Sequence, residues 1–170
     1  MERISSGDRR VFETLYQETS QRVFFYLNRL LQDRSTAEDI LVETFTQAWK
    51  NAHRFQGQSK ASTWIFGIAR NLALNELRKR KPVEDIEDHP ELEEPGDPLQ
   101  DMEAEDRKAA VRDALIRVSA KHREVLDLVF FHEMNYQEIA AILDVPLNTV
   151  KTRVFHAKKA VKKKLGSTLR

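Results

Sequence analysis

Apolar residues recur every three or four positions along most of the chain, which is the spacing of amphipathic α-helices. A first helix is predicted after Asp8, a second over residues 35–51 and a third over residues 62–80. Ser35 and Glu38 have the spacing of a capping box at the start of the second helix. No segment shows the alternation of a β-strand, so the pattern predicts an all-α protein.

A segment rich in proline and acid separates these helices from the rest of the chain. Pro82 ends the third helix, because proline lacks an N–H and constrains the residue before it. Between Val83 and Asp106 there are twelve acidic residues and no Lys or Arg. Such a segment cannot bury a core, so we expect it to be extended or disordered. The predicted organisation is a first domain at 1–81, an acidic linker at 82–103 and a second domain at 104–170.

The linker also conceals the charge of the two domains. The chain of 170 residues has a net charge of only +1, yet without the twelve linker acids its 28 basic residues face 15 acidic ones. Two basic bodies joined by an acidic segment favour a polyanionic partner, with nucleic acid as the first candidate. On charge alone, a solvated basic surface is an equally good explanation.

Several classes of protein are disfavoured by composition. The chain has no cysteine, which excludes disulfides, thiolate catalysis and Cys-ligated zinc. No apolar run approaches the roughly 20 residues of a membrane-spanning helix, and the N-terminus has no signal-peptide pattern, so we expect a cytoplasmic protein. The histidines are scattered and the glycines form no phosphate-binding loop. We therefore expect no catalytic site, no metal or other cofactor and no small-molecule substrate.

The most specific motif is a predicted helix-turn-helix at 135–165, behind helices predicted at 104–118 and 119–132. Asn135 and Glu138 predict a capping box at the start of a short helix, and Pro146 ends it. A longer helix starts near Leu147 and is predicted to end at Gly166. Two helices joined by so short a turn form the DNA-binding unit whose second helix enters the major groove.

The longer helix combines an apolar stripe with a basic remainder. From Lys151 to the C-terminus there are eight Lys or Arg and no acid. In a recognition helix, residues that read bases lie near its start and cations that bind phosphates follow. Phe155 on the polar face fits contact with a thymine methyl group, although ordinary core is the alternative for Phe155 and a solvated helix for the lysines. The agreement of helix, turn and charge favours DNA binding. The predicted stripe is Val150, Val154, Ala157, Val161 and Leu165.

The third helix and the loop before it have a composition typical of single-stranded DNA binding. Aromatic rings stack on bases, amides bond base edges and cations bind the backbone. For Trp64 and Phe66 taken alone, an ordinary core is the better explanation. The residues concerned are Phe55, Gln56, Lys60, Trp64, Phe66, Asn71, Asn75 and the four cations at 78–81.

Three segments of the chain resemble, in the same order, bacterial sigma factors of the sigma-70 family, in the compact extracytoplasmic function (ECF) group. STAEDILVETFTQAW resembles region 2.2, and FQGQSKASTWIFGIARNLALNELRKR resembles regions 2.3 and 2.4. HREVLDLVFFHEMNYQEIAAILDVPLNTVKTRVFHAKKAVKKKL resembles region 4. The resemblance implies a region 2 helical bundle and a wingless region 4 helix-turn-helix, joined by a flexible linker. It also implies a transcription-initiation factor rather than an enzyme.

The resemblance further implies three binding surfaces. The protein would bind core RNA polymerase at the clamp helices of its largest subunit, read the −35 promoter element as duplex, and melt and bind the −10 element as a single strand. The polymerase-binding residues would be Asp39, Glu43, Phe45, Gln47 and Trp49. The −10 residues would be Phe55, Lys60, Trp64, Asn71, Asn75 and Arg78. The −35 residues would be Arg123, Asn148, Thr149, Lys151, Thr152, Arg153, Phe155, His156, Lys158 and Lys159.

An anti-sigma factor is a further partner that the family implies, and one anchored in the membrane would hold the protein at its inner face. Some residues depart from the family pattern, notably Val42 in place of glutamine and His156 where arginine is frequent. Two other functions compete with this interpretation. A response-regulator output protein would need a strand-containing phosphoacceptor domain. An adaptor that binds polymerase without reading DNA would not need the basic, aromatic recognition helix.

Overall fold

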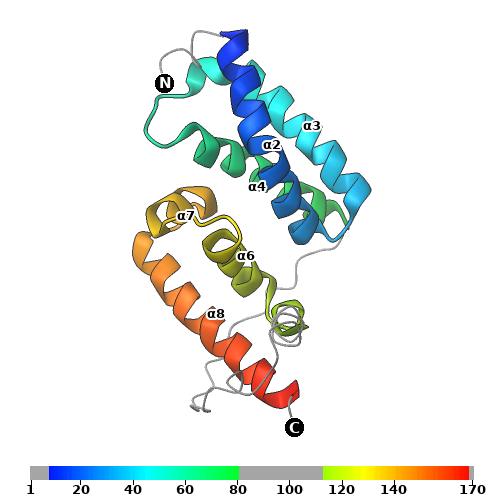
Figure 1. Ribbon diagram of the computed structural model, residues 1–170, viewed down its shortest axis with the longest axis vertical. Coiled ribbons are helices and arrows are strands. Elements are labelled where there is room, and N and C mark those ends of the chain that lie inside the picture. The colour runs from blue at the N-terminus through cyan, green and yellow to red at the C-terminus, as the bar shows by residue number, and fades with distance from the viewer. Residues whose placement is uncertain (1–7, 81–112, 169–170) are drawn as a thin grey trace.

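The computed structural model describes residues 8–80 and 113–168, and its regular structure within these ranges is entirely helical (Figure 1). The all-α prediction is therefore confirmed. The predicted linker at 82–103 lies outside the described residues. So does most of the helix predicted at 104–118, of which residues 113–117 are described and helical.

Residues 8–80, here called the N-terminal body, form three long helices. Asp8 caps the first by accepting a hydrogen bond from the Arg10 backbone N–H, and Gln32 ends it with a positive φ of 53°. Tyr26 and Phe66 are among the largest fully buried side chains of the core between these helices. The elements are α2 (Arg9–Leu31), α3 (Arg34–Lys50), the 3-10 turn η1 (Ala52–Arg54) and α4 (Ala61–Arg80).

The predicted capping box of α3 is wrong by two residues. Asp33, not Ser35, is the cap: its backbone is extended and its carboxylate accepts from the Thr36 N–H at 3.0 Å. Ser35 lies inside the first turn as a result. Glu38 does not reach back to the cap but pairs with Arg34 at 2.9 Å.

Residues 113–168, here called the C-terminal body, contain the predicted helix-turn-helix. Ser119 caps α6, and Asn135 with Glu138 forms the predicted capping box at the start of α7. The predicted end of the last helix at Gly166 is wrong, because α8 continues to Thr168. Gly166 does not adopt the positive φ with which glycine ends helices. The elements are α6 (Ala120–Phe130), α7 (Tyr136–Leu143) and α8 (Leu147–Thr168).

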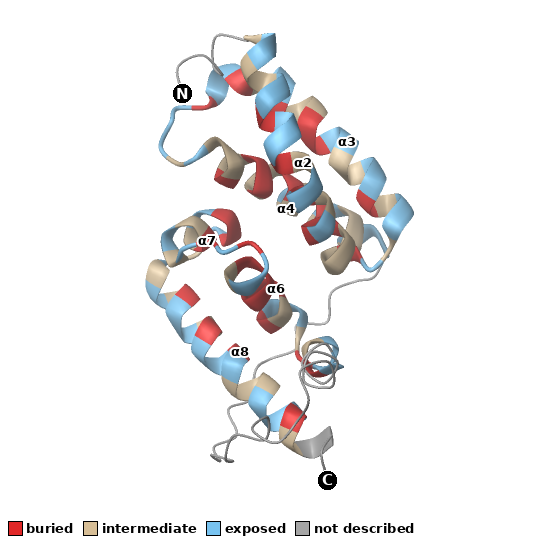
Figure 2. Cartoon of the chain, in the orientation of Figure 1, coloured by how far each residue is buried: buried red, intermediate tan, exposed pale blue. Residues whose placement is uncertain are grey.

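The two bodies pack directly against each other. Helix α4 lies against α7 and α2 lies against α6, and buried positions line both sides of this junction (Figure 2). Within the part of the chain that the structure describes, no helix has the length and apolar character needed to cross a bilayer.

Candidate nucleic-acid and polymerase interfaces

The predicted recognition helix α8 is held by its apolar stripe. Val150, Val154, Ala157 and Leu165 are buried, and Val161 is half-buried, as the spacing predicted. The turn before α8 is fixed by Asp144, which has a positive φ of 53°, and by Pro146, whose carbonyl accepts from the Thr149 and Val150 N–H groups. This framework sets the rotation of α8, so the opposite face must point to solvent.

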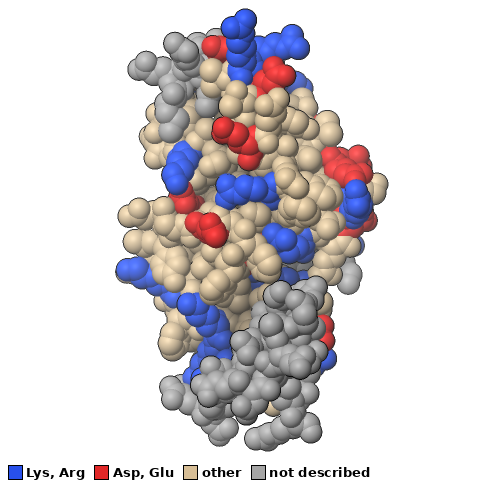
Figure 3. Space-filling view, viewed as in Figure 1, with Lys and Arg blue, Asp and Glu red and all other residues tan. Residues whose placement is uncertain are grey.

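The exposed face of α8 carries most of the predicted −35 residues. Phe155 is 64% exposed, which rules out the core alternative for this ring, and it lies edge-on to His156 with centroids 5.4 Å apart. Figure 3 shows basic side chains along the α8 edge at lower left. Asn148, Lys151, Thr152 and Lys158 are also exposed, whereas Thr149, Arg153 and Lys159 are half-buried.

Arg123 lies apart from the other predicted −35 residues. It is on α6, and its guanidinium donates to the carbonyl oxygens of Leu115 at 3.1 Å, Ile116 at 2.8 Å and Val118 at 3.4 Å. These carbonyls lie at the C-terminal end of the helix at 113–117. Arg123 therefore caps that helix, and its role in phosphate binding stays a prediction.

The predicted −10 residues divide into a packed pair and an exposed row. Phe55 is only 8% exposed and its ring lies 5.1 Å from that of half-buried Trp64. At about 100° per residue, Trp64, Asn71, Asn75 and Arg78 fall within about 60° of one another around α4. The last three are exposed, and Arg78 donates to the Asn75 side-chain oxygen at 3.3 Å. Ring, amides and cation therefore follow one stripe of the helix.

Phe66, considered above as a stacking residue, belongs to the core. It is fully buried, with its ring 5.4 Å from that of Tyr26. The ordinary-core explanation is correct for this residue.

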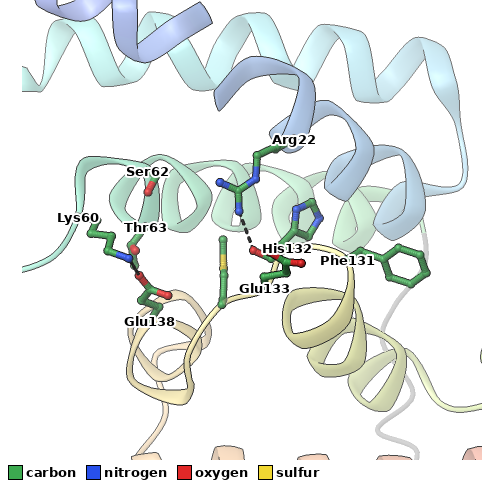
Figure 4. A pocket seen from close by; sticks show the side chains of 9 residues that line it. Arg22, Lys60, Ser62, Thr63, Phe131, His132, Glu133 and Glu138 are labelled. Carbon is green, nitrogen blue, oxygen red and sulfur yellow. Dashed lines mark hydrogen bonds and ion pairs between the residues drawn. The ribbon is translucent and has the colours of Figure 1, made fainter. Parts of the chain in front are cut away.

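Lys60, the remaining predicted −10 residue, is paired with the other body. Its ammonium lies 2.7 Å from a carboxylate oxygen of Glu138 at the edge of a cavity of about 290 Å³ between the bodies (Figure 4). Burial alone would raise the pKa of Glu138, but hydrogen bonds from Lys60 and from the Asn135 N–H outweigh it and lower that pKa below its ordinary value.

The predicted polymerase-binding residues of α3 also divide by burial. Asp39, Glu43 and Trp49 are exposed, and Gln47 donates to Glu43 at 3.0 Å. Phe45 is buried, with its ring 4.7 Å from Tyr16 and 6.2 Å from Phe12. Phe45 is therefore part of the contact that holds α3 against α2, and its role in polymerase binding stays a prediction.

Two parts of the α3 surface were missed by sequence reasoning. Val42, noted only as a departure from the family pattern, is 68% exposed. Trp49 packs on Phe12 with ring centroids 5.0 Å apart. These two rings and that of Tyr16 line a shallow open groove. Helical spacing alone does not separate Tyr16 from the core positions of α2, and only the folded chain shows that this ring is exposed.

Sequence reasoning also missed a buried ionic network between the bodies. The Tyr26 hydroxyl donates to Glu124 at 2.7 Å, and Arg70 bonds the same carboxylate with two nitrogens, at 2.8 and 3.3 Å. Burial, and next the negative charge of Glu124, raise the pKa of Tyr26 well above its ordinary value. Burial would lower the pKa of Arg70, but the bonds to Glu124 raise it.

A second buried cluster lies beside the first. Asp127 pairs with Arg29 and with His132, the latter at 3.2 Å. Arg22 donates to the His132 backbone carbonyl at 2.7 Å, and the Arg29 guanidinium lies 4.7 Å from the Phe131 ring centroid. The sequence contains one indication of these two clusters. Two acidic residues, Glu124 and Asp127, lie three residues apart among the apolar positions of α6.

Comparison with known proteins identifies the family. The chain matches the family models for sigma-70 region 2 over residues 15–83 and sigma-70 region 4 over residues 108–161. The RNA polymerase sigma-H factor of Pseudomonas aeruginosa is 30% identical over 181 residues, which cover 100% of this chain and 94% of that protein. The chain belongs to the sigma-70 family of sigma factors, in its ECF group.

Other members of the family agree with this assignment. The ECF sigma factor SigW of Bacillus subtilis is 27% identical over 179 residues, covering 97% of this chain and 94% of that protein. The sigma factor RpoE of Bartonella quintana, solved with the anti-sigma factor NepR, has the same fold. Its TM-score is 0.68 at 24% identity, and the match covers 91% of this chain and 96% of that chain. As a sigma factor, the chain binds core RNA polymerase and directs transcription initiation at specific promoters.

Proposed function

We propose that this sigma factor divides promoter recognition between two faces. The exposed basic face of α8 reads the −35 element as duplex in the major groove. The loop before α4 and the stripe from Trp64 to Arg78 recognise the −10 element and hold its melted strand. The domains are those predicted from the sequence, 1–81 and 104–170, with the linker at 82–103 between them.

The observation that carries this division is the contrast between the two helices. On α8, the aromatic Phe155 stands exposed among cations, which fits base-edge contacts followed by phosphate contacts. On α4, Asn71 and Asn75 lie one turn apart on the stripe that begins with Trp64, which fits stacking and edge bonds to unpaired bases.

We further propose that α3 binds the polymerase clamp helices through Asp39, Glu43, Gln47 and Trp49, with buried Phe45 holding α3 against α2. A half-apolar patch with an exposed tryptophan is typical of interface centres. The sigma factor itself carries out no catalytic step in this scheme, acts in the cytoplasm, and leaves the chemistry to the polymerase.

Run-off transcription with core polymerase on a genomic DNA pool tests the function as a whole. We expect promoter-specific starts that depend on this protein. Binding to DNA without directed initiation would refute the proposal.

Two variants test the division of labour on a promoter found in that way. Phe155→Ala should reduce discrimination against an altered −35 base by about tenfold, without changing −10 opening. Asn71→Ala should reduce permanganate reactivity of thymines near −10, without changing −35 discrimination. Phe25→Ala, an exposed phenylalanine outside all three surfaces, and Gln17→Ala, an exposed amide on α2, are the matched controls. Uniform losses of affinity in both test variants would contradict the division.

An anti-sigma factor is also part of the proposal, supported by the complex of the relative RpoE with NepR. A stoichiometric complex with such a factor that abolishes run-off transcription is the expected result. A factor that binds without inhibiting initiation would contradict this part.

A further inference from the structure

Phe130, at the C-terminal end of α6, is a large apolar side chain to which the proposed function gives no role. Its ring is 60% exposed, so packing in the core does not account for it. Helices α6 and α8 pack against each other (Figure 1), and the Lys158 ammonium lies over the Phe130 ring, 5.5 Å from its centroid. An ammonium within about 6 Å of a ring centroid is attracted by the negative face of the ring. The structure therefore joins two exposed residues of different helices in a cation–π contact.

Lys158 lies at the border of the predicted −35 face of α8. It follows buried Val154 by one turn and exposed Phe155 by three residues. At about 100° per residue, it lies about 40° from the first and about 60° from the second around the helix. A lysine in such a position lays its aliphatic stem along apolar surface while its charged end stays in water. Helical side chains also lean toward the N-terminus, which in α8 is the end proposed to contact bases.

An aromatic ring holds a cation differently from a carboxylate. The carboxylate of Glu138 holds the Lys60 ammonium at 2.7 Å and opposes its charge. The Phe130 ring has no net charge and accepts no N–H···O hydrogen bond, so the Lys158 ammonium keeps its charge and its donors for an oxygen ligand. A lysine that is already held in place also loses less rotamer freedom when it binds. A ring beneath a lysine therefore prepares it for a phosphate, whereas a carboxylate competes with one.

We infer that Phe130 is a positioning residue for −35 recognition, which holds the Lys158 ammonium toward a phosphate at the edge of the α8 face. This inference rests on the proposed −35 function of α8. Phe130 acts through Lys158 and contacts no base itself. Loss of the ring should therefore weaken promoter binding without removing a charge, whereas loss of Lys158 removes both the charge and the reason for the ring.

A double-mutant cycle tests this coupling in the holoenzyme formed with core polymerase, on a promoter found by run-off transcription. Phe130→Leu keeps an apolar side chain but removes the ring. It should weaken promoter binding about twofold at low salt and leave the salt slope of log affinity unchanged, because Lys158 is still present. In the Lys158→Ala background, Phe130→Leu should have no effect. Equal effects in the two backgrounds would overturn the inference, because the ring would then act independently of Lys158.

Two matched variants separate positioning from support of the fold. Phe130→Tyr keeps an aromatic face at the same place and should bind the promoter as tightly as the unsubstituted protein. Lys162 is exposed one turn farther along α8 and provides a control cycle. Phe130→Leu should weaken binding by the same factor with Lys162→Ala as without it. Failure of tyrosine to restore binding, or coupling to Lys162 as strong as coupling to Lys158, would overturn the inference.

Nuclear magnetic resonance measures the contact in the free, full-length chain. Protons above an aromatic ring are shifted upfield by its ring current, so the ε-methylene resonance of Lys158 should move downfield in Phe130→Leu and stay in place in Phe130→Tyr. An unchanged position in Phe130→Leu would show that the ring does not hold the ammonium, and would overturn the inference. If the unsubstituted holoenzyme starts no promoter-specific transcription, the proposed function fails and the inference fails with it. If transcription is promoter-specific and the cycle with Lys158 is additive, only the role of Phe130 fails.

Discussion

Phe155 and Phe55 are both predicted to contact promoter DNA, yet the first is 64% exposed and the second 8% exposed. On α8, the apolar stripe holds the helix and the opposite face is free, so folding and recognition use different residues. In the loop before α4, Phe55 packs on Trp64, so the same rings serve both the core and the proposed −10 site. Duplex DNA can be read by a rigid, fully exposed surface, whereas a flipped base needs a pocket with packed walls.

The largest difference should appear in stability. Phe55→Ala should lower the free energy of unfolding by about 3 kcal/mol, because it empties a packed aromatic site. Phe155→Ala should change it by less than about 0.5 kcal/mol. Urea unfolding followed by circular dichroism measures both. Similar losses in the two variants would remove the distinction between the faces.

The second prediction concerns the support of α8. Asn135→Ala should lower the free energy of unfolding by about 1 kcal/mol, because it removes the cap of α7, on which α8 packs. Asn148→Ala, in the exposed first turn of α8, is the matched control and should leave the thermal midpoint unchanged while weakening −35 binding. A lower midpoint for the control alone would show that the exposed face also contributes to folding.

A smaller effect is expected from a single phosphate contact. Lys158→Ala should weaken duplex binding about threefold at low salt and reduce the salt slope of log affinity by about 0.9. Lys121→Ala, exposed on α6 away from the recognition face, should leave the slope unchanged. Fluorescence anisotropy at several salt concentrations measures both. An equal reduction for the two lysines would indicate a diffuse basic surface rather than an α8 face.

The smallest effect should come from acid, through the ion pair between Lys60 and Glu138. Glu138 has a lowered pKa in the folded chain, so it contributes stability that is present above its ordinary value of 4.5 and lost as the pH falls through the lowered value. The free energy of unfolding, measured with urea, should therefore decrease below about pH 4.5, and Glu138→Gln should remove the part due to this group. An unchanged acid response in the variant would assign it to other carboxylates.

Local patterns predicted most of the fold and the α8 face. The apolar stripe of α8 and the capping box of Asn135 and Glu138 depend only on residues a few positions apart. The sequence alone therefore predicts them. The cap of α3 was misplaced because Asp33 and Ser35 are both good caps, and only backbone conformation decides between them. Gly166 was misread because a glycine ends a helix only when it adopts a positive φ.

The contact between the bodies could not be predicted in this way. Tyr26 and Glu124 are 98 residues apart, and Arg22 and His132 are 110 apart. Each appears in the sequence as an ordinary helix residue. Their pairing depends on how two separately formed bodies dock, which helical periodicity does not encode.

Arg123 connects the segment at 113–118 to α6 by three hydrogen bonds in addition to the backbone. The two therefore behave as one mechanical piece, and the next residue after Arg123 is Glu124, at the centre of the interface. Tension arriving at residue 113 would be transmitted directly to that carboxylate. A strain on the chain between the two promoter contacts would thus reach Glu124, one of several groups that join the bodies, through α6.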